Sequence, residues 1–422
     1  MEKKQVPAIR FQGFTDAWEQ RKLGEVIRLN GRIGFRGYTE KDIVSKDDGG
    51  VLTFSPTNIV DNKLTTNCKN TYITRFKYDE SPEIKIHNGD ILFVKTGSTL
   101  GKSALVTGLS EDATLNPQVV VMRTNNLNAE FLAAMLVTNI IISQVNSAKI
   151  GGAVPTLTET KIKDFDVAIP ISEAEKEQIG QFFSQLDHLI TLHQRKYEKL
   201  LKVKKSMLEK MFPRDGADVP EIRFDGFTDA WEQRKLGELV DRVVRKNTNN
   251  ESTLPLTISA QYGLVDQITY FNNRVASRDV SNYYLVLNGE FAYNKSTSDG
   301  YPFGAVKRLD LYEKGVLSTL YIVFSPKKEQ QIDSDFLTVF FDTDRWHKGV
   351  AERAAEGARN HGLLNISAED FFDIDLSVPK DVAEQKQIGA FIRQLDHLIT
   401  LHQRKLEKLK NIKKSLLEKM FV

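Results

Sequence analysis

The chain has 422 residues, and its 58 Lys and Arg against 56 Asp and Glu leave a formal charge of only +2. Apolar residues make up 41% and charged residues 27%, which excludes wholesale disorder, and the length suggests two to four domains. The near-neutral charge excludes a uniformly basic nucleic-acid coat but leaves room for a basic face. A single cysteine, Cys68, excludes an intrachain disulfide and a cysteine-based zinc site.

No part of the chain is predicted to enter a membrane. The N-terminal residues MEKKQVPAIRF lack the apolar stretch of a secretory signal. The most apolar window, residues 131–142, has only 12 residues and contains Thr138 and Asn139, so it predicts a buried helix and not a membrane span. We therefore expect a cytoplasmic protein.

A segment near the start of the chain recurs in its middle. Residues 6–25 read VPAIRFQGFTDAWEQRKLGE and residues 219–238 read VPEIRFDGFTDAWEQRKLGE, with 18 of 20 positions identical. A repeat of this kind decides the architecture and has to be found first. Its large apolar residues are predicted to pack in a core; they are Phe11, Phe14, Trp18 and Leu23, and their copies Phe224, Phe227, Trp231 and Leu236.

The block that follows, roughly residues 26–165, contains a glycine-rich loop at residues 97–103, after the apolar run 91–94. It is similar to a phosphate-binding loop but has three residues between its glycines where that motif needs four, which argues against a nucleotide hydrolase. A turn that presents Lys, Ser and Thr is nevertheless suited to contact a DNA backbone, which also carries phosphates.

A long helix is predicted from residue 172 to residue 211. Ser172 followed by Glu175 is the spacing of a capping box, and Asp381 with Glu384 repeats it in the second half. Beyond these starts, residues 177–212 and 386–421 share 27 of 36 positions, including the identical run QLDHLITLHQRK, and their apolar period is 3.5. That period indicates a coiled-coil seam, for which the other copy is the obvious partner. The seam residues are Leu186, Ile190, His193, Tyr197, Leu200, Leu395, Ile399, His402, Leu406 and Leu409.

Residues 211–224 mix Pro, Gly and Asp and are predicted to form a linker. The second block, roughly residues 239–374, shares little with the first, although Asn288-Gly289-Glu290 before a strand matches Asn88-Gly89-Asp90 at an offset of 200, which predicts a common fold. Unlike blocks between preserved frames suggest one task performed on two targets, since drift alone would hardly preserve 12 of 12 helix positions.

Polar loop residues of both blocks are the candidate DNA contacts, because they supply the donors and acceptors that base edges and phosphates require. Composition alone leaves solvated hairpin loops as an equal alternative. The candidates in the first block are Lys95, Thr96, Ser98, Thr99 and Lys102. Those in the second block are Gln261, Tyr262, Asn294, Lys295, Ser296, Ser298, Tyr301 and Lys307.

No catalytic or metal-binding motif stands out in the sequence. His188 and His193 are five residues apart on the predicted helix and do not converge on one face, so His193 and its copy His402 are interpreted as polar register positions. A Gly-x-Ser-x-Gly elbow and the Asn/Asp-Pro-Pro-aromatic tetrad of amino-methyltransferases are both absent. We expect no catalytic residues and no metal in this chain.

The paired FxGFTDAWEQRKLGE frames, the paired QLDHLITLHQRK helices and the segment from Asn288 to Leu309 resemble the DNA-specificity subunit of type I restriction–modification systems. The resemblance covers essentially the whole chain. It implies an α+β protein with pseudo-twofold internal duplication, in which two mixed α/β target recognition domains are separated by two long helices that pair as an antiparallel coiled coil. The implied domains are residues 1–170, a helix and linker at 171–214, residues 215–379, and a second helix at 380–422.

The resemblance also implies a function. Each recognition domain would read one half of a bipartite, asymmetric site in double-stranded DNA, and the helices would set the gap between the half-sites. The chain would dock two modification (methyltransferase) subunits and the restriction (translocase and nuclease) subunits. S-adenosylmethionine, ATP and Mg would belong to those partners, so no cofactor is expected on this chain. The alternative is a coiled-coil scaffold or adaptor whose duplicated domains bind a ligand other than DNA.

Overall fold

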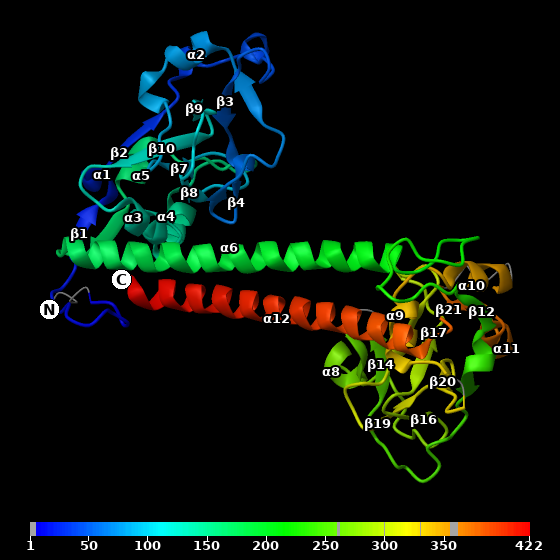
Figure 1. The fold of residues 1–422 in the computed structure, drawn as a ribbon. Coiled ribbons are helices and arrows are strands. Elements are labelled where there is room, and N and C mark those ends of the chain that lie inside the picture. Colours follow the sequence, from blue (N-terminus) through cyan, green and yellow to red (C-terminus); the bar gives the residue numbers. More distant parts are fainter. Residues whose placement is uncertain (1–5, 260–261, 299, 330, 355–361) are drawn as a thin grey trace. The chain divides into compact units, whose positions relative to one another are not determined.

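The computed structural model describes residues 6–259, 262–298, 300–329, 331–354 and 362–422 (Figure 1). These residues form two compact units. Unit 1 comprises Met1–Gln194 and Arg404–Val422, and unit 2 comprises Arg195–Gln403. Each unit therefore holds one α/β block together with the beginning of one long helix and the end of the other. The domain boundaries expected along the chain at residues 170, 214 and 379 stay a prediction, since compactness divides the long helices instead.

Unit 1 is built on a four-stranded antiparallel sheet in the order β2-β10-β7-β8. Its strands are β2 (Ile27–Gly31), β7 (Ile91–Val94), β8 (Ser103–Leu105) and β10 (Val119–Thr124). Three smaller sheets accompany it: β1 (Glu19–Lys22) with β11 (Asp166–Ile169), β4 (Ile59–Val60) with β5 (Lys63–Leu64), and β3 (Val51–Phe54) between β6 (Thr71–Ile73) and β9 (Ala113–Leu115). Its short helices are α1 (Leu23–Val26), α2 (Arg75–Asp79), α3 (Ala129–Leu136), α4 (Asn139–Ala148) and α5 (Glu159–Lys163).

Unit 2 repeats the same sheet with the order β13-β20-β17-β18. Its strands are β13 (Val240–Arg242), β17 (Phe291–Asn294), β18 (Ala305–Arg308) and β20 (Ile322–Pro326). The smaller sheets pair β12 (Glu232–Lys235) with β21 (Asp375–Val378), β14 (Leu256–Ser259) with β15 (Gly263–Asp266), and β16 (Tyr284–Leu287) with β19 (Lys314–Leu317). The helices are α7 (Leu236–Leu239), α8 (Gln267–Phe271), α9 (Ser334–Phe341), α10 (His347–Arg353) and α11 (Ala368–Phe372). The common fold predicted from the offset of 200 is confirmed.

The central strands of unit 1 are apolar over all of β7 and over Val119–Met122 of β10, because these parts separate two cores. Successive side chains of a strand point to opposite faces. Ile91 and Phe93 of β7 therefore enter a cluster with α3, α4 and the long helices, whereas Leu92 and Val94 enter a second cluster with β3 and β9. In unit 2, β17 does the same with Phe291 and Tyr293 on one face and Ala292 on the other. Each unit is thus layered as helices, central sheet and outer sheets.

The two long helices are α6 (Glu173–Lys210) and α12 (Val382–Met420). Within unit 1, Leu186 and Ile190 of α6 pack with Leu406 of α12, and the Nζ atom of Lys413 lies 2.7 Å from both carboxylate oxygens of Asp187. Higher numbers on α6 meet lower numbers on α12, so the helices run antiparallel there.

Unit 2 holds the copy of this pair. Lys204, the repeat of Lys413, lies 2.7 Å from the carboxylate of Asp396, the repeat of Asp187. The predicted seam residues are buried or partly buried. They are Leu186, Ile190, Leu395, Ile399 and Leu406, which are buried, and His193, Tyr197, Leu200, His402 and Leu409, which are of intermediate exposure.

The residues that follow the long helices are buried in the cores of the two units. Met211 and Phe212 follow α6 directly and are buried in the core of unit 2, where Phe212 contacts Trp231 and Phe336. Phe421, the repeat of Phe212, follows α12 and contacts Trp18 in the core of unit 1. Because α6 ends at Lys210 and no helix or strand follows before β12, residues 211–224 form the predicted linker, and its first two residues are buried in the core.

The apolar window 131–142 is also divided differently from the prediction. It forms parts of two helices, since α3 ends at Leu136 and α4 begins at Asn139, with Thr138 between them. The first is buried as expected, whereas Ile140 and Ile142 are exposed. Among the described residues no single helix is long and apolar enough to cross a membrane, and α3 with α4 reach that length only together, across a bend of 62°.

Candidate nucleic-acid interface

The glycine-rich loop of unit 1 closes the hairpin between β7 and β8. Gly97 and Gly101 have φ angles of +111° and +86°, which L side chains rarely adopt. The amide of Gly101 donates to the carbonyl of Val94 at 2.9 Å, and that of Lys102 donates to Thr99 at 3.1 Å. The loop is followed by a strand, and these amides form hydrogen bonds within the hairpin itself. A nucleotide phosphate loop is followed by a helix and points its amides at the ligand, so the geometry agrees with the argument from glycine spacing.

A second segment, residues 149–157, lies against this hairpin. The amide of Leu157 donates to the carbonyl of Lys95 at 2.8 Å, and the amide of Gly97 donates to the carbonyl of Pro155 at 2.9 Å. This segment is not among the predicted DNA contacts. Its signal was present in Gly151, Gly152 and Pro155, which mark a turn, but nothing local to a turn names the loop that it contacts.

The five predicted contacts of unit 1 differ in how far they are free to bind. Ser98 and Lys102 are exposed, and within the described part of the chain Lys102 has no ion pair. Lys95 is less available, because its Nζ atom lies 3.2 Å from the carboxylate of Glu159 on α5. Thr96 and Thr99 are of intermediate exposure on the same hairpin. The structure brings all five residues to one end of the central sheet.

Unit 2 has the equivalent pair of segments. The amide of Thr297 donates to the carbonyl of Gly362 at 2.7 Å, and that of Leu364 donates to Lys295 at 2.9 Å. The ammonium of Lys295 also donates to the carbonyl of Ile366 at 3.3 Å. The backbone pattern of unit 1 therefore recurs with Lys and Leu kept at one hydrogen bond, whereas Gly97 and Pro155 are replaced by Thr297 and Gly362 at the other.

The predicted contacts of unit 2 are not all in one place. Asn294 is the last residue of β17, and Lys295, Ser296, Ser298 and Tyr301 lie in the loop between β17 and β18. The amide of Ser296 donates to the Asn294 side chain at 3.0 Å, and the amide of Tyr301 donates to the carbonyl of Ser298 at 2.8 Å. Tyr262 lies in the turn between β14 and β15 and is exposed. Gln261 lies outside the described residues.

Lys307 is engaged within the protein. Its Nζ atom lies 2.6 Å from Asp342, and Lys204 lies 3.2 Å from the same carboxylate. Burial raises the pKa of Asp342, but the two ammonium groups outweigh it and hold that pKa below its ordinary value. A DNA phosphate would have to compete with this pair for Lys307, so the assignment of Lys307 as a DNA contact stays a prediction with less support than Lys102.

The two repeated frames are joined by a buried ion pair in each unit. In unit 1, Arg10 donates from Nε and Nη2 to the two oxygens of Glu175 at 2.6 and 2.7 Å, and the indole of Trp18 donates to the same carboxylate at 3.3 Å. The hydrogen bond with Glu175 raises the pKa of Arg10. The Glu175 side chain is only 1% exposed. This clamp fixes the start of α6 against the N-terminal frame.

Unit 2 contains the same clamp. Arg223 donates to Glu384 at 2.7 and 2.8 Å, and Trp231 donates to it at 3.3 Å. The predicted capping boxes were half right. The amide of Glu175 does donate to the Ser172 hydroxyl at 3.4 Å, but the glutamate carboxylates accept from Arg and Trp and not from the cap backbone. Arg and Trp in one frame and Glu in the other are thus repeated together because they form one contact.

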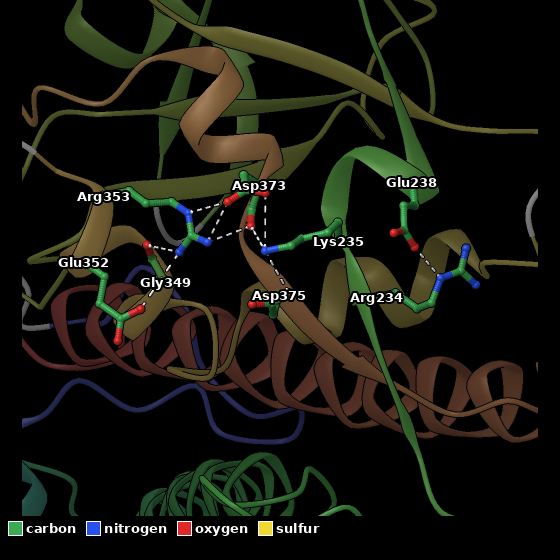
Figure 2. A network of polar contacts seen from close by, with 8 residues as sticks. All are labelled: Arg234, Lys235, Glu238, Gly349, Glu352, Arg353, Asp373 and Asp375. Carbon is green, nitrogen blue, oxygen red and sulfur yellow. Dashed lines mark hydrogen bonds and ion pairs between the residues drawn. The ribbon is translucent and has the colours of Figure 1, made fainter.

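Unit 2 also contains a network of polar contacts around Asp373 (Figure 2). Lys235 lies 3.3 Å from Asp373 and 3.2 Å from Asp375, and Arg353 of α10 lies 2.8 Å from Asp373. The hydrogen bond from Arg353 lowers the pKa of Asp373. Unit 1 has the simpler pair of Lys22 with Asp166 at 2.6 Å. The carboxylates of these pairs are more than half exposed, and pairs of that kind stabilise by less than about 1 kcal/mol. They join β12, β21 and α10 without forming a chemical site.

The described residues contain no group of three or more His, Cys, Asp or Glu that could hold a metal ion. Two copies of one frame, each carrying a different hairpin surface, define an internally duplicated α/β protein. The model of the type I restriction modification DNA specificity domain matches residues 15–202 and again residues 229–411. The chain belongs to this family.

Individual proteins are more distantly related. A putative type I restriction enzyme MjaX specificity subunit from Methanocaldococcus jannaschii is 24% identical over 202 residues, which cover 46% of this chain and 45% of that protein. The type I restriction enzyme MjaVIII specificity subunit of the same organism is 22% identical over 227 residues, 53% of this chain and 49% of that protein. The chain thus spans about half the length of the curated relatives it matches. The crystal structure of a type I restriction–modification S subunit from M. genitalium has a similar fold, with a TM-score of 0.63, 14% identity and 99% coverage of both chains.

Proposed function

We propose that this chain is the DNA-specificity subunit of a type I restriction–modification complex. Each unit reads one half of a bipartite, asymmetric site in double-stranded DNA. The observation that carries the proposal is the match of the specificity-domain model to both halves of the chain, whose frames are nearly identical while their hairpin surfaces differ. With nearly identical frames and different hairpin surfaces, the two units can bind DNA in the same orientation while each recognises a different half-site.

The chain itself supplies recognition and no chemistry. Two modification subunits bring the methyltransferase site and S-adenosylmethionine, and restriction subunits bring the ATP- and Mg-dependent translocase and nuclease. Support comes from the composition of the hairpin surfaces, which offer hydroxyl, amide and ammonium groups that suit base edges and phosphates. The long helices and the repeated frames are the surfaces common to both halves, and therefore the ones suited to dock two copies of the same subunit.

The test is a map of methylated adenines in a host genome that carries the modification subunits, with and without this chain. We expect the chain to add one motif with two unlike halves at a fixed spacing, and its deletion to remove that motif. A methylation map that does not change would refute the proposal. If the chain binds the modification subunits and yet adds no motif, the scaffold or adaptor function is correct instead.

A further inference from the structure

The segment that packs against the unit 1 hairpin exposes two branched aliphatic side chains. Ile150 is 58% exposed and Val154 is 59% exposed. Burying such a side chain is worth about 1.5–3 kcal/mol, so folding alone favours placing both of them elsewhere. Because the two side chains share one short turn, they present a small apolar surface to solvent.

The loop holds these side chains in place by its own hydrogen bonds. The amides and carbonyls of Ile150 and Thr156 bond to each other at 2.9 and 2.8 Å. Between them Gly151 has a φ of +87°, and a Cβ atom there would lie 2.9 Å from the carbonyl oxygen of Val154. The turn is therefore closely built, and Ile150 and Val154 project from it in a defined way.

The surroundings of the two side chains suit a polyanion. The hairpin segment 91–110 and the segment 131–158 contain no Asp or Glu, whereas they contain Lys95, Lys102 and Lys149. Pro155 accepts the hydrogen bond of Gly97, so the apolar tip and the glycine-rich loop belong to one surface. Glu159 lies at the edge of this surface, where its carboxylate pairs with Lys95 at 3.2 Å. Lys102 and Lys149 are exposed and have no ion pair among the described residues, and this positive charge favours DNA over an apolar protein partner.

We infer that Ile150 and Val154 are specificity-determining residues that contact the 5-methyl groups of thymines in the half-site read by unit 1. Among the base edges in the major groove, only thymine presents a methyl group, and aliphatic side chains recognise it by apolar contact. The surrounding lysines, threonines and Ser98 supply the contacts to phosphates and polar base edges. The inference rests on the proposed function.

The experiment selects binding sites from duplex libraries randomised in both half-sites, prepared either with thymine or with uracil, which lacks the methyl group. The full chain is used in complex with its modification subunits. With thymine DNA we expect preferred T·A positions in one half-site. With uracil DNA those preferences should fall by about fourfold per methyl contact, while the polar preferences of the other half-site persist.

The variants Ile150→Ala and Val154→Ala should lose the same preferences on thymine DNA and be indifferent to uracil. Ile142→Ala, which changes an exposed isoleucine on α4 outside the loop, is the matched control and should select like the parent. Retained polar preferences in the half-site read by unit 1 show that unit 1 of the variants is folded, because both substitutions lie in that unit.

The outcomes separate the inference from the proposed function. If the parent enriches sequences in both half-sites but treats thymine and uracil alike, the inference is wrong and the proposed function stands. If the alanine variants weaken binding without any thymine–uracil difference, the side chains act as a wedge between bases, which also overturns the inference. If no sequence is enriched at all, the proposed function fails.

Discussion

The buried clamp between the repeated frames is the contact whose loss should matter most for the stability of each unit. Replacing Glu175 with Gln removes the charge that neutralises Arg10, whose side chain is only 11% exposed. Leaving one partner of a buried ion pair uncompensated costs about 3–5 kcal/mol. For a unit of about 200 residues, at 2–4 °C per kcal/mol, this corresponds to a fall in the unfolding midpoint of about 6–20 °C.

Hydrogen exchange resolves which unit is affected. Glu175→Gln should increase amide exchange in β1 and β11 of unit 1, and Glu384→Gln should do so in β12 and β21 of unit 2. Glu173→Gln is a matched control on the same helix turn, because Glu173 is 69% exposed and its pair with Lys176 is worth less than about 1 kcal/mol.

A double substitution tests the physical cause. Arg10→Met with Glu175→Met removes both charges and should recover much of the loss, since a buried ion pair replaced by apolar residues is often neutral. The reasoning is refuted if the single substitutions lower the midpoint no more than the Glu173→Gln control does. It is also refuted if the two single effects simply add in the double variant, because a coupled pair must not behave additively.

Further predictions concern the helices, acid stability and DNA binding. Asp187→Lys and Lys413→Asp should each lower the free energy of unfolding of unit 1 by about 1–3 kcal/mol in urea, and the double variant should recover that stability. If the double variant does not recover it, the pair does not set the register of the two helices. The lowered pKa of Asp342 stabilises the fold at pH values above about 3.9, the pKa of Asp in an unfolded chain, and this stability is lost as the pH falls through the folded pKa. Asp342→Asn should therefore weaken the dependence of stability on pH in acid, and an unchanged dependence contradicts this. Lys102→Ala should weaken binding to all DNA sequences and reduce the slope of log K against log salt by about one, and an unaltered slope would exclude a phosphate contact. Four residues inserted into both α6 and α12, between the two Asp–Lys pairs, should lengthen the preferred gap between half-sites without changing them, as methylation mapping would detect.

Regular local patterns allowed the elements of the fold to be predicted. The start signals at Ser172 and Asp381 placed the long helices within a residue or two of α6 and α12, because capping residues act on the backbone next to them. The offset of 200 between the two hairpins indicated the common sheet, because the strand and turn pattern survives where individual side chains do not.

The partners of individual side chains were a different matter. Glu175 had the right spacing for a capping box, but its carboxylate is used by Arg10, 165 residues away. Lys307 is a residue type that suits a DNA contact, but its ammonium group forms an ion pair with Asp342. Nothing near either residue in the sequence indicates this pair. The strongest electrostatic partner in a folded chain is chosen by proximity in space, which local spacing does not report.

The candidate interface shows the same division. The glycine-rich loop was found from its residues, whereas the segment 149–157 beside it became part of the surface only through its hydrogen bonds to Lys95 and Gly97. Ile150 and Val154 would be read from sequence as ordinary core residues, and their exposure is known only from the fold.

What the sequence by itself determined is the duplication, the two helices and the kinds of residues on each hairpin, since identity, period and composition are properties of the chain. The tertiary structure decided which helix end fills which core, with Phe212 in unit 2 and Phe421 in unit 1, and which polar groups remain free to bind. The net charge of +2 is likewise known from the sequence, whereas the positions of the charged groups in space are known only from the fold. The physical reason is that burial and charge pairing depend on contacts between residues far apart in the chain, and these exist only once it has folded.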